Sequence, residues 1–260
     1  MSEKFMCTTD EKLVIVFRIV IWQKIWRLLN FGAALEFANG SKCAWSARAC
    51  VHDNYDPFSM MIFRLNEGFA TYIEYKGVQS YHADWDMDAK FLTGDLHPVL
   101  ELDATESSHP IVVDVSEPDQ INAVFDTIAY NKGASVIRMM EDFMGQNDFR
   151  RGISNFLRKF SFQNAITEDL FRELSAASSE NLNIAQIMDT WTRQKGYPVL
   201  IVERQNGEIL LKQERFLTST PENPEPSPYG YKWEIPISYK KSDGSVNRLW
   251  FHLNDDILRM

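Results

Sequence analysis

The hydrophobic positions in the middle of the chain recur at a helical period. Phe69, Tyr72 and Ile73 follow the i, i+3, i+4 spacing of one helix face, and Asn66 before them is a favourable N-cap. This pattern predicts a helix that begins at Asn66 and carries Glu67 in its first turn, where the helix dipole favours a carboxylate. An apolar stripe of Val136, Met139, Met140 and Phe143 ahead of Gly145 predicts one further helix, and Asn183 is the predicted N-cap of another. Cap and stop residues predict the remaining helices in the same way. All of these further helices are expected at about 84–105, 120–126, 132–144, 148–160, 168–177 and 184–194.

The hydrophobic period changes to two after Pro198, which is typical of strands. Apolar residues alternate on both sides of Asn206-Gly207, the pair preferred in a type I′ hairpin turn. A second hairpin is predicted to pair residues 231–239 with residues 248–253. Four strands are too few to close a β-sandwich, so the pattern predicts a partial antiparallel β-sandwich.

The most apolar stretch of the chain is LVIVFRIVIW at residues 13–22. It has about half of the ~20 residues that span a bilayer, and Arg18 lies near its centre. The residues before it carry no net positive charge, so they do not resemble the start of a secretory signal peptide. A buried strand or a short amphipathic helix is the simpler interpretation, and the compartment of the protein stays open.

Three segments follow from these patterns. Residues 1–57 are unassigned, residues 58–196 are helical, and residues 197–260 form strands, with the first boundary near Asp56-Pro57 where the composition shifts. The predicted fold class is therefore α+β.

The composition and charge are those of a globular protein. Of the 260 residues, 45% are hydrophobic and 24% are charged, which excludes a disordered or a collagen-like chain. The formal net charge of −9 offers no diffuse positive field, so nucleic acid is not an expected partner. Cys7, Cys43 and Cys50 are spaced neither like a disulfide framework nor like a zinc knuckle.

Three ordered motifs resemble a known family. Residues 65–70 read LNEGFA, residues 125–136 read FDTIAYNKGASV, and residues 190–199 read TWTRQKGYPV. These are similar to the LNEGFA, FDxIxYxKGASV and TWTxQxGYPV segments of the zinc aminopeptidases of the aminopeptidase N family. The SSHP sequence at residues 107–110 also fits, and the resemblance covers about residues 65–217.

The resemblance implies a fold, a cofactor and two site residues. Members of this family have a thermolysin-like catalytic domain followed by a β-sandwich, so residues 58–196 correspond to the mostly helical second half of the catalytic domain. By position, Glu67 is the carboxylate ligand of zinc, and Tyr130 is the hydroxyl that stabilises the oxyanion of the tetrahedral intermediate. The substrates implied are peptides, from which the intact relatives remove N-terminal residues. Without the resemblance, the simpler interpretation of Glu67 is an acidic residue that the helix dipole favours in a first turn. Tyr130 would then be an ordinary half-buried aromatic residue.

The other parts of the family's active site are missing from the sequence. Two histidines at i, i+4 in an HExxH motif normally supply the first two zinc ligands. Counting back from Glu67 places Ala44, Trp45 and Arg48 where the first histidine, the general base and the second histidine should be. His52 is the nearest histidine, and the amine-binding GxMEN box is also absent. We therefore expect that this chain alone does not bind zinc and is catalytically inactive.

Several interpretations of the whole chain remain open. It is a truncated copy, a misjoined coding segment or a degenerate paralogue of a zinc metallo-aminopeptidase. A second hypothesis is a non-catalytic interaction module that pairs with a full-length aminopeptidase, or with itself, through exposed apolar surface. A third is a chain that does not fold stably, because half of a core rarely offsets the entropy of ordering.

Overall fold

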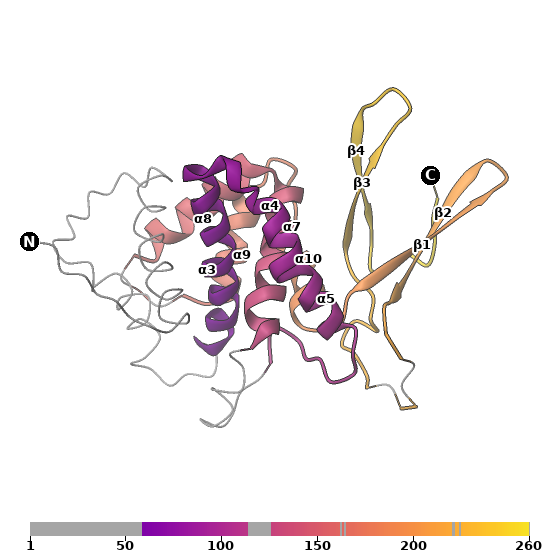
Figure 1. Cartoon of the computed structure of the whole chain (residues 1–260), viewed down its shortest axis with the longest axis horizontal. Helices are drawn as coiled ribbons and strands as arrows, with labels where there is room; N and C mark the ends of the chain where they lie inside the picture. The colour runs from indigo at the N-terminus through magenta and orange to yellow at the C-terminus, as the bar shows by residue number, and fades with distance from the viewer. Residues whose placement is uncertain are drawn as a thin grey trace, which may run out of the picture.

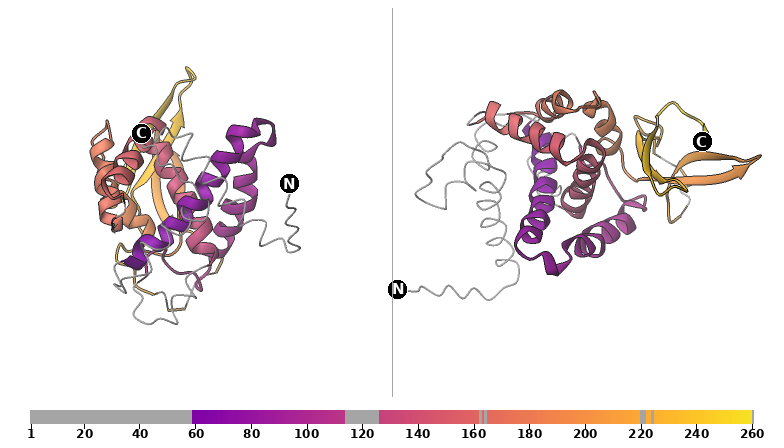
Figure 2. Two further views of the ribbon diagram at one scale, coloured as in Figure 1. Left: turned by 90° about the vertical axis from the view of Figure 1, so that its left-hand side faces the viewer. Right: turned by 90° about the horizontal axis from the view of Figure 1, so that it is seen from above.

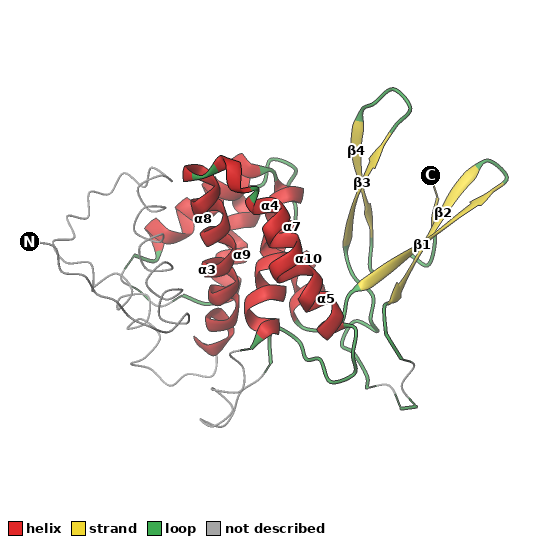
Figure 3. Ribbon diagram, viewed as in Figure 1, coloured by secondary structure: helices red, strands yellow, loops and turns green. Residues whose placement is uncertain are grey.

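The computed structural model describes residues 59–113, 126–161, 163, 165–219, 222–223 and 225–259. A helical region is followed by two small antiparallel sheets, so the predicted α+β character is confirmed (Figure 1; Figure 3). The predictions for the apolar stretch at 13–22, the three cysteines, His52 and the boundary at Asp56-Pro57 lie outside the described residues, as does most of the predicted helix at 120–126.

The helical region contains ten described elements, three of which are short 3₁₀ or π-helical turns. In chain order they are α3 (Ser59–Tyr81), η1 (Ala83–Trp85), α4 (Met87–Phe91), η2 (Leu92–Leu96), α5 (His97–Asp103), η3 (Ile128–Lys132), α7 (Gly133–Met144), α8 (Gln146–Lys159), α9 (Thr167–Ala177) and α10 (Ile184–Thr192).

The first helix begins earlier than the sequence pattern predicted. α3 begins at Ser59, so Asn66 is not its N-cap and Glu67 is not in its first turn. No glycine or proline lies between Ser59 and Glu67, so nothing in this segment prevents the helix from extending upstream. The dipole argument for Glu67 is therefore wrong, because the effect is confined to the first turn.

The predicted helix at 84–105 is divided into four elements. Asp86 adopts a left-handed conformation with φ of 47° and ends η1, and its carboxylate accepts from the Ala89 amide at 3.3 Å. Pro98 lacks an amide hydrogen and crowds the preceding turn, and the π-helical turn η2 lies directly before it. The apolar pattern was helical, but Asp86 interrupts it, and the turn ahead of Pro98 is π-helical instead of α-helical.

The main hydrophobic core lies among α3, α7, α8, α9 and α10. In the stripe predicted on α7, Val136, Met140 and Phe143 are buried, and Met139 packs against the cluster. Gly145 ends the helix with φ of 79°, as predicted. None of the described helices has the length and hydropathy needed to cross a membrane.

The strands form two sheets, which diverge in Figure 1 and are seen from above in Figure 2. β1 (Pro198–Gln205), β2 (Glu208–Arg215) and β5 (Leu258–Arg259) pair in the order β1-β2-β5, and β3 (Ile235–Lys240) pairs with β4 (Val246–Phe251). Asn206 and Gly207 have φ of 53° and 90°, which confirms the predicted type I′ turn. The sequence pattern missed β5, because two residues are too short to show a period.

Several contacts join the β3-β4 hairpin and the loop before it to the helices. Trp191 at the end of α10 donates its indole N–H to the Glu234 carbonyl at 2.8 Å. The Arg248 guanidinium on β4 lies 2.7 Å from the Asp142 carboxylate on α7, and Phe143 and Trp250 pack edge to face. The β3-β4 hairpin is therefore fixed against α7.

Candidate functional site

The two predicted site residues lie on elements that touch. Glu67 is in the first half of α3 and Tyr130 is at the centre of η3. Gly68, next to Glu67, packs so closely on the start of α7 that a Cβ there would lie 2.5 Å from the carbonyl carbon of Gly133. Only glycine permits this approach. The contact holds the helix of Glu67 against the segment of Tyr130.

The segment that carries Tyr130 is capped at its start by Asp126. The Asp126 Oδ1 accepts from the amides of Ile128 and Ala129 at 3.0 and 3.1 Å, and its carbonyl accepts from the Tyr130 amide at 3.1 Å. The Nε2 of His109, from the SSHP sequence, lies 2.5 Å from the Asp126 Oδ2. Side-chain capping of this kind fixes where a helix begins.

Lys132 anchors the other end of the segment. Its ammonium is buried, lies 2.8 Å from the Asp103 carboxylate, and donates to the carbonyls of Gln194 and Gly196 at 3.3 and 3.1 Å. Burial lowers the pKa of Lys132 below its usual value, and the Asp103 charge opposes that lowering. Tyr130 is thus held between a cap and a buried ion pair.

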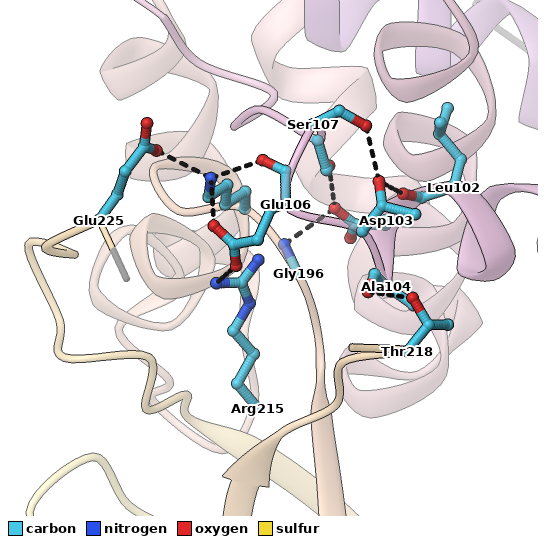
Figure 4. Close-up of polar contacts among 12 residues, drawn as sticks. Leu102, Asp103, Ala104, Glu106, Ser107, Gly196, Arg215, Thr218 and Glu225 are labelled. Carbon is cyan, nitrogen blue, oxygen red and sulfur yellow. Dashed lines mark hydrogen bonds and ion pairs between the residues drawn. The ribbon is translucent and has the colours of Figure 1, made fainter. Parts of the chain in front are cut away.

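Asp103 also belongs to a polar network at the junction of helices and strands, and Figure 4 shows the contacts of Asp103, Glu106 and Arg215 in it. The second Asp103 oxygen accepts from the Gly196 amide at 2.8 Å. Glu106 lies 2.9 Å from the Arg215 guanidinium and 3.2 Å from the Lys195 ammonium, which also contacts Glu225 at 2.8 Å. These charges are paired with one another, so the network fixes the junction.

A cavity of about 640 Å³ lies between the second half of α3, the α4–α5 segment and α7. Inside it Tyr72 donates to the Glu141 carboxylate, which is also 2.9 Å from the Lys76 ammonium. Burial raises the pKa of the Tyr72 hydroxyl, and the contact with Glu141 adds to the rise. Neither Glu67 nor Tyr130 lines this cavity. Lys132 and Asp103, the pair that anchors the Tyr130 segment, do line it.

The described residues place no set of side chains that would hold a zinc ion. Within the described part of the chain, no group of three or more histidine, cysteine, aspartate or glutamate side chains is placed to hold a metal. His109 and His252 contact Asp126 and Glu234, and His82 stacks on Trp85. A protein zinc site requires at least three such ligands. Glu67 alone does not provide one.

The sequence reasoning missed the residues that hold the motifs together. Lys132 and Asp126 belong to the second motif, and Gln194 and Gly196 to the third, yet only Tyr130 was singled out from these two motifs. In the structure Lys132 contacts the third motif, and the SSHP histidine contacts Asp126. The signal was their position inside the motifs, but partners 62 and 64 residues apart cannot be read from spacing.

Comparison with known proteins identifies aminopeptidases among the relatives of this chain. The chain is 45% identical to human glutamyl aminopeptidase over 181 residues, which is 69% of this chain and 18% of that protein. It is 40% identical to aminopeptidase A of Gloydius brevicauda over 195 residues, which is 74% of this chain and 20% of the relative. It is also 40% identical to tricorn protease-interacting factor F2 of Thermoplasma volcanium over 186 residues, which is 71% of this chain and 23% of the relative.

The match therefore spans about a fifth of the length of these relatives. Residues 61–191, half of the chain, match the Peptidase family M1 domain. The chain belongs to peptidase family M1.

Proposed function

We propose that this chain is the part of a zinc aminopeptidase catalytic domain that carries the zinc glutamate, Glu67, and the oxyanion tyrosine, Tyr130. The helical region then corresponds to the second half of a thermolysin-like domain, and the strands to the beginning of a β-sandwich. In intact relatives the substrates are peptides that lose N-terminal residues. In this proposal residues 58–196 form the catalytic part, residues 197–260 form the sandwich part, and residues 1–57 are unassigned.

One observation supports the proposal most directly. The Gly68 contact on Gly133 joins the helix of Glu67 to the segment of Tyr130 at backbone distance. Two residues that act on one substrate must lie on elements fixed relative to each other. The cap at Asp126 and the ion pair at Lys132 fix the second element on both sides of Tyr130.

The same proposal implies that the chain alone does not hydrolyse peptides. Zinc, when bound by a full ligand set, supplies an activated water and polarises the substrate carbonyl. The sequence contains no HExxH motif, and the described residues place no second or third ligand. A lone carboxylate binds a divalent transition metal weakly, so Glu67 has a role only beside ligands from another segment.

The expected result for the purified chain is no bound zinc and no hydrolysis of aminoacyl arylamides. Glu67→Gln removes the charge but keeps the size of the side chain. Wild-type and variant chains should have the same zinc content, below about one-tenth of an equivalent, because one ligand does not form a site. Metal analysis after dialysis against zinc and an arylamide assay measure this.

A chelator-sensitive hydrolysis that Glu67→Gln abolishes would show that the chain completes its own metal site. In that case residues outside the described part of the chain supply the missing zinc ligands, and the prediction that the chain is inactive is wrong. The exposed Glu101→Gln on α5 serves as the matched control for any non-specific loss of zinc.

A second candidate is a non-catalytic module that associates through apolar surface. Val202 on β1 and Val246 on β4 are 64% and 69% exposed, one on each hairpin. Exposed apolar residues mark an association surface when a partner covers them, and each hairpin offers at least one such residue. The partner in this candidate is a full-length family M1 aminopeptidase or a second copy of the chain.

Light scattering on the chain alone and mixed with glutamyl aminopeptidase tests this candidate. Association that Val202→Ser or Val246→Ser weakens about tenfold would support it, since burial of one valine contributes about 1.5 kcal/mol. A monomer that does not bind the aminopeptidase contradicts it. Thr93→Ser, at an exposed position on η2, is the control.

A further inference from the structure

The cavity between α3, the α4–α5 segment and α7 has mostly apolar walls. The buried side chains of Phe91, Val99 and Val136 line it. The half-buried apolar side chains in its walls are Leu96, Leu100, Met139 and Trp191. Its volume of about 640 Å³ lies within the range of ~300–1,000 Å³ that is usual for sites of drug-sized molecules. The cavity is therefore large enough for an organic molecule.

Each charged side chain among the described residues that line the cavity is held in an ion pair. The pairs are Lys76–Glu141 at 2.9 Å, Lys132–Asp103 at 2.8 Å, Arg248–Asp142 at 2.7 Å and Arg138–Asp88 at 3.5 Å. The charges of these pairs sum to zero. An ion that entered the cavity would lose its hydration without meeting an unpaired opposite charge, and such burial is costly. The expected occupant is therefore uncharged.

The side chain of Tyr197 supplies the cavity with a hydrogen-bond donor. Its ring stacks on Phe216 with the centroids 5.5 Å apart, and its hydroxyl has no hydrogen-bond partner among the described residues. Burial raises the pKa of Tyr197 above its usual value, and the Asp103 carboxylate adds to the rise, so the hydroxyl keeps its proton at neutral pH. A protonated hydroxyl can donate to an acceptor on a ligand.

We propose that this cavity binds an uncharged organic molecule that has an apolar body and a hydrogen-bond acceptor for the Tyr197 hydroxyl. Its walls use side chains of the second and third motifs that the proposed function leaves without a role in the chemistry. These are Lys132, Ser135, Val136, Trp191 and Tyr197. The occupant contacts the Lys132–Asp103 pair, which anchors the Tyr130 segment. Binding requires neither zinc nor hydrolysis, so this site goes beyond the proposed function.

Prodan, an uncharged fluorescent ketone with a naphthalene ring, has the required properties. The 260-residue chain should bind one molecule of it saturably, with a blue shift of its emission as it leaves water. Leu100→Trp, which fills the cavity from α5, should weaken this binding at least about tenfold, which corresponds to about 1.4 kcal/mol. Leu102→Trp is the matched control, because Leu102 is on the same helix but does not line the cavity, and it should leave the binding unchanged.

Two further measurements test the chemical class of the ligand. Tyr197→Phe keeps the ring and removes the hydroxyl, so Prodan should bind it about fivefold more weakly, as expected for one neutral hydrogen bond. Anilinonaphthalene sulfonate is an anion with a similar ring system. Its binding should contain no component that Leu100→Trp removes, because the anion would meet no unpaired cation.

The methyl group of Met139 reports on the cavity without any substitution. Met139 lines the cavity and Met144 does not, so Prodan should shift the Met139 signal in ¹³C-methyl spectra and leave the Met144 signal in place. An unchanged Met139 signal overturns the proposal, even where Leu100→Trp does not fold.

Three other results also contradict the proposal. The absence of saturable binding, or equal binding by Leu100→Trp and Leu102→Trp, would show that the cavity is not the site. Undiminished binding by Tyr197→Phe removes the hydrogen bond. Sulfonate binding that Leu100→Trp abolishes removes the uncharged class. None of these measurements involves zinc or hydrolysis, so failure here leaves the proposed function standing.

Discussion

Lys132→Met is expected to lower the free energy of unfolding by about 3–5 kcal/mol, because it leaves the buried Asp103 carboxylate without its partner charge. Asp103 and Lys132 are both almost completely buried, and their charged atoms lie 2.8 Å apart. The variant also removes the donor to the Gln194 and Gly196 carbonyls. Urea unfolding followed by tryptophan fluorescence measures the change.

The double variant Asp103→Asn/Lys132→Met is the control. It removes both charges and keeps an oxygen that can accept from the Gly196 amide, so it should be more stable than Lys132→Met alone. If Lys132→Met unfolds within about 1 kcal/mol of the wild type, the ion pair does not hold the Tyr130 segment.

The same pair gives stability a dependence on alkaline pH. Burial lowers the pKa of folded Lys132, whereas the unfolded lysine titrates near 10.5. Between these two values the unfolded chain binds the extra proton, so the free energy of unfolding rises with pH in that window. Methionine does not titrate, so the free energy of unfolding of Lys132→Met should not show this rise. Urea unfolding of both chains at several alkaline pH values measures the difference.

Gly68→Ala is expected to lower the free energy of unfolding by about 3 kcal/mol or more, since the added methyl group overlaps backbone atoms that cannot rotate away. Its Cβ would lie 2.5 Å from the Gly133 carbonyl carbon and 2.8 Å from the Ala134 nitrogen. The same clash should separate α3 from the start of α7. Thermal unfolding and urea unfolding both report the loss.

Gly94→Ala is the matched control, because Gly94 is also helical and its nearest neighbour would be the Tyr75 hydroxyl at 3.4 Å. It should be neutral or up to about 1 kcal/mol more stable, since alanine favours helix over glycine. Equal stability of the two variants would mean that α3 and the start of α7 can move apart at no cost.

Local signals in the sequence were enough for many element boundaries. Asn183 was predicted to cap α10, and its side chain does accept from the Gln186 amide at 3.2 Å. Gly145 and the Asn206-Gly207 pair also act as predicted, because positive φ is a property of the residue and its neighbours.

The failures came from effects that residue type does not encode locally. α3 extends upstream of Asn66 because a capping residue stops being a cap once the chain before it is helical. β5 exists only because β2 offers it an edge to pair with. The roles of Glu67 and Tyr130 stay predictions, as do the domain boundaries.

The side chains that contact the motif residues could also not be predicted from the sequence. Motifs identified which segments matter, but Lys132 meets Asp103, and His109 meets Asp126, only after the chain folds. A buried lysine also contradicts the usual expectation that lysine is exposed.

The contact of Gly68 on Gly133 has a consequence for how such genes are surveyed. Gly68 and Gly133 lie in two of the motifs, and their role is to let one backbone pack on another. This packing requirement persists whether or not a reaction occurs. A search that scores these motifs therefore detects common descent. It gives a high score even to a chain that lacks the metal-binding residues of the family. Genome annotation of such chains should count the metal-binding side chains separately before assigning an activity.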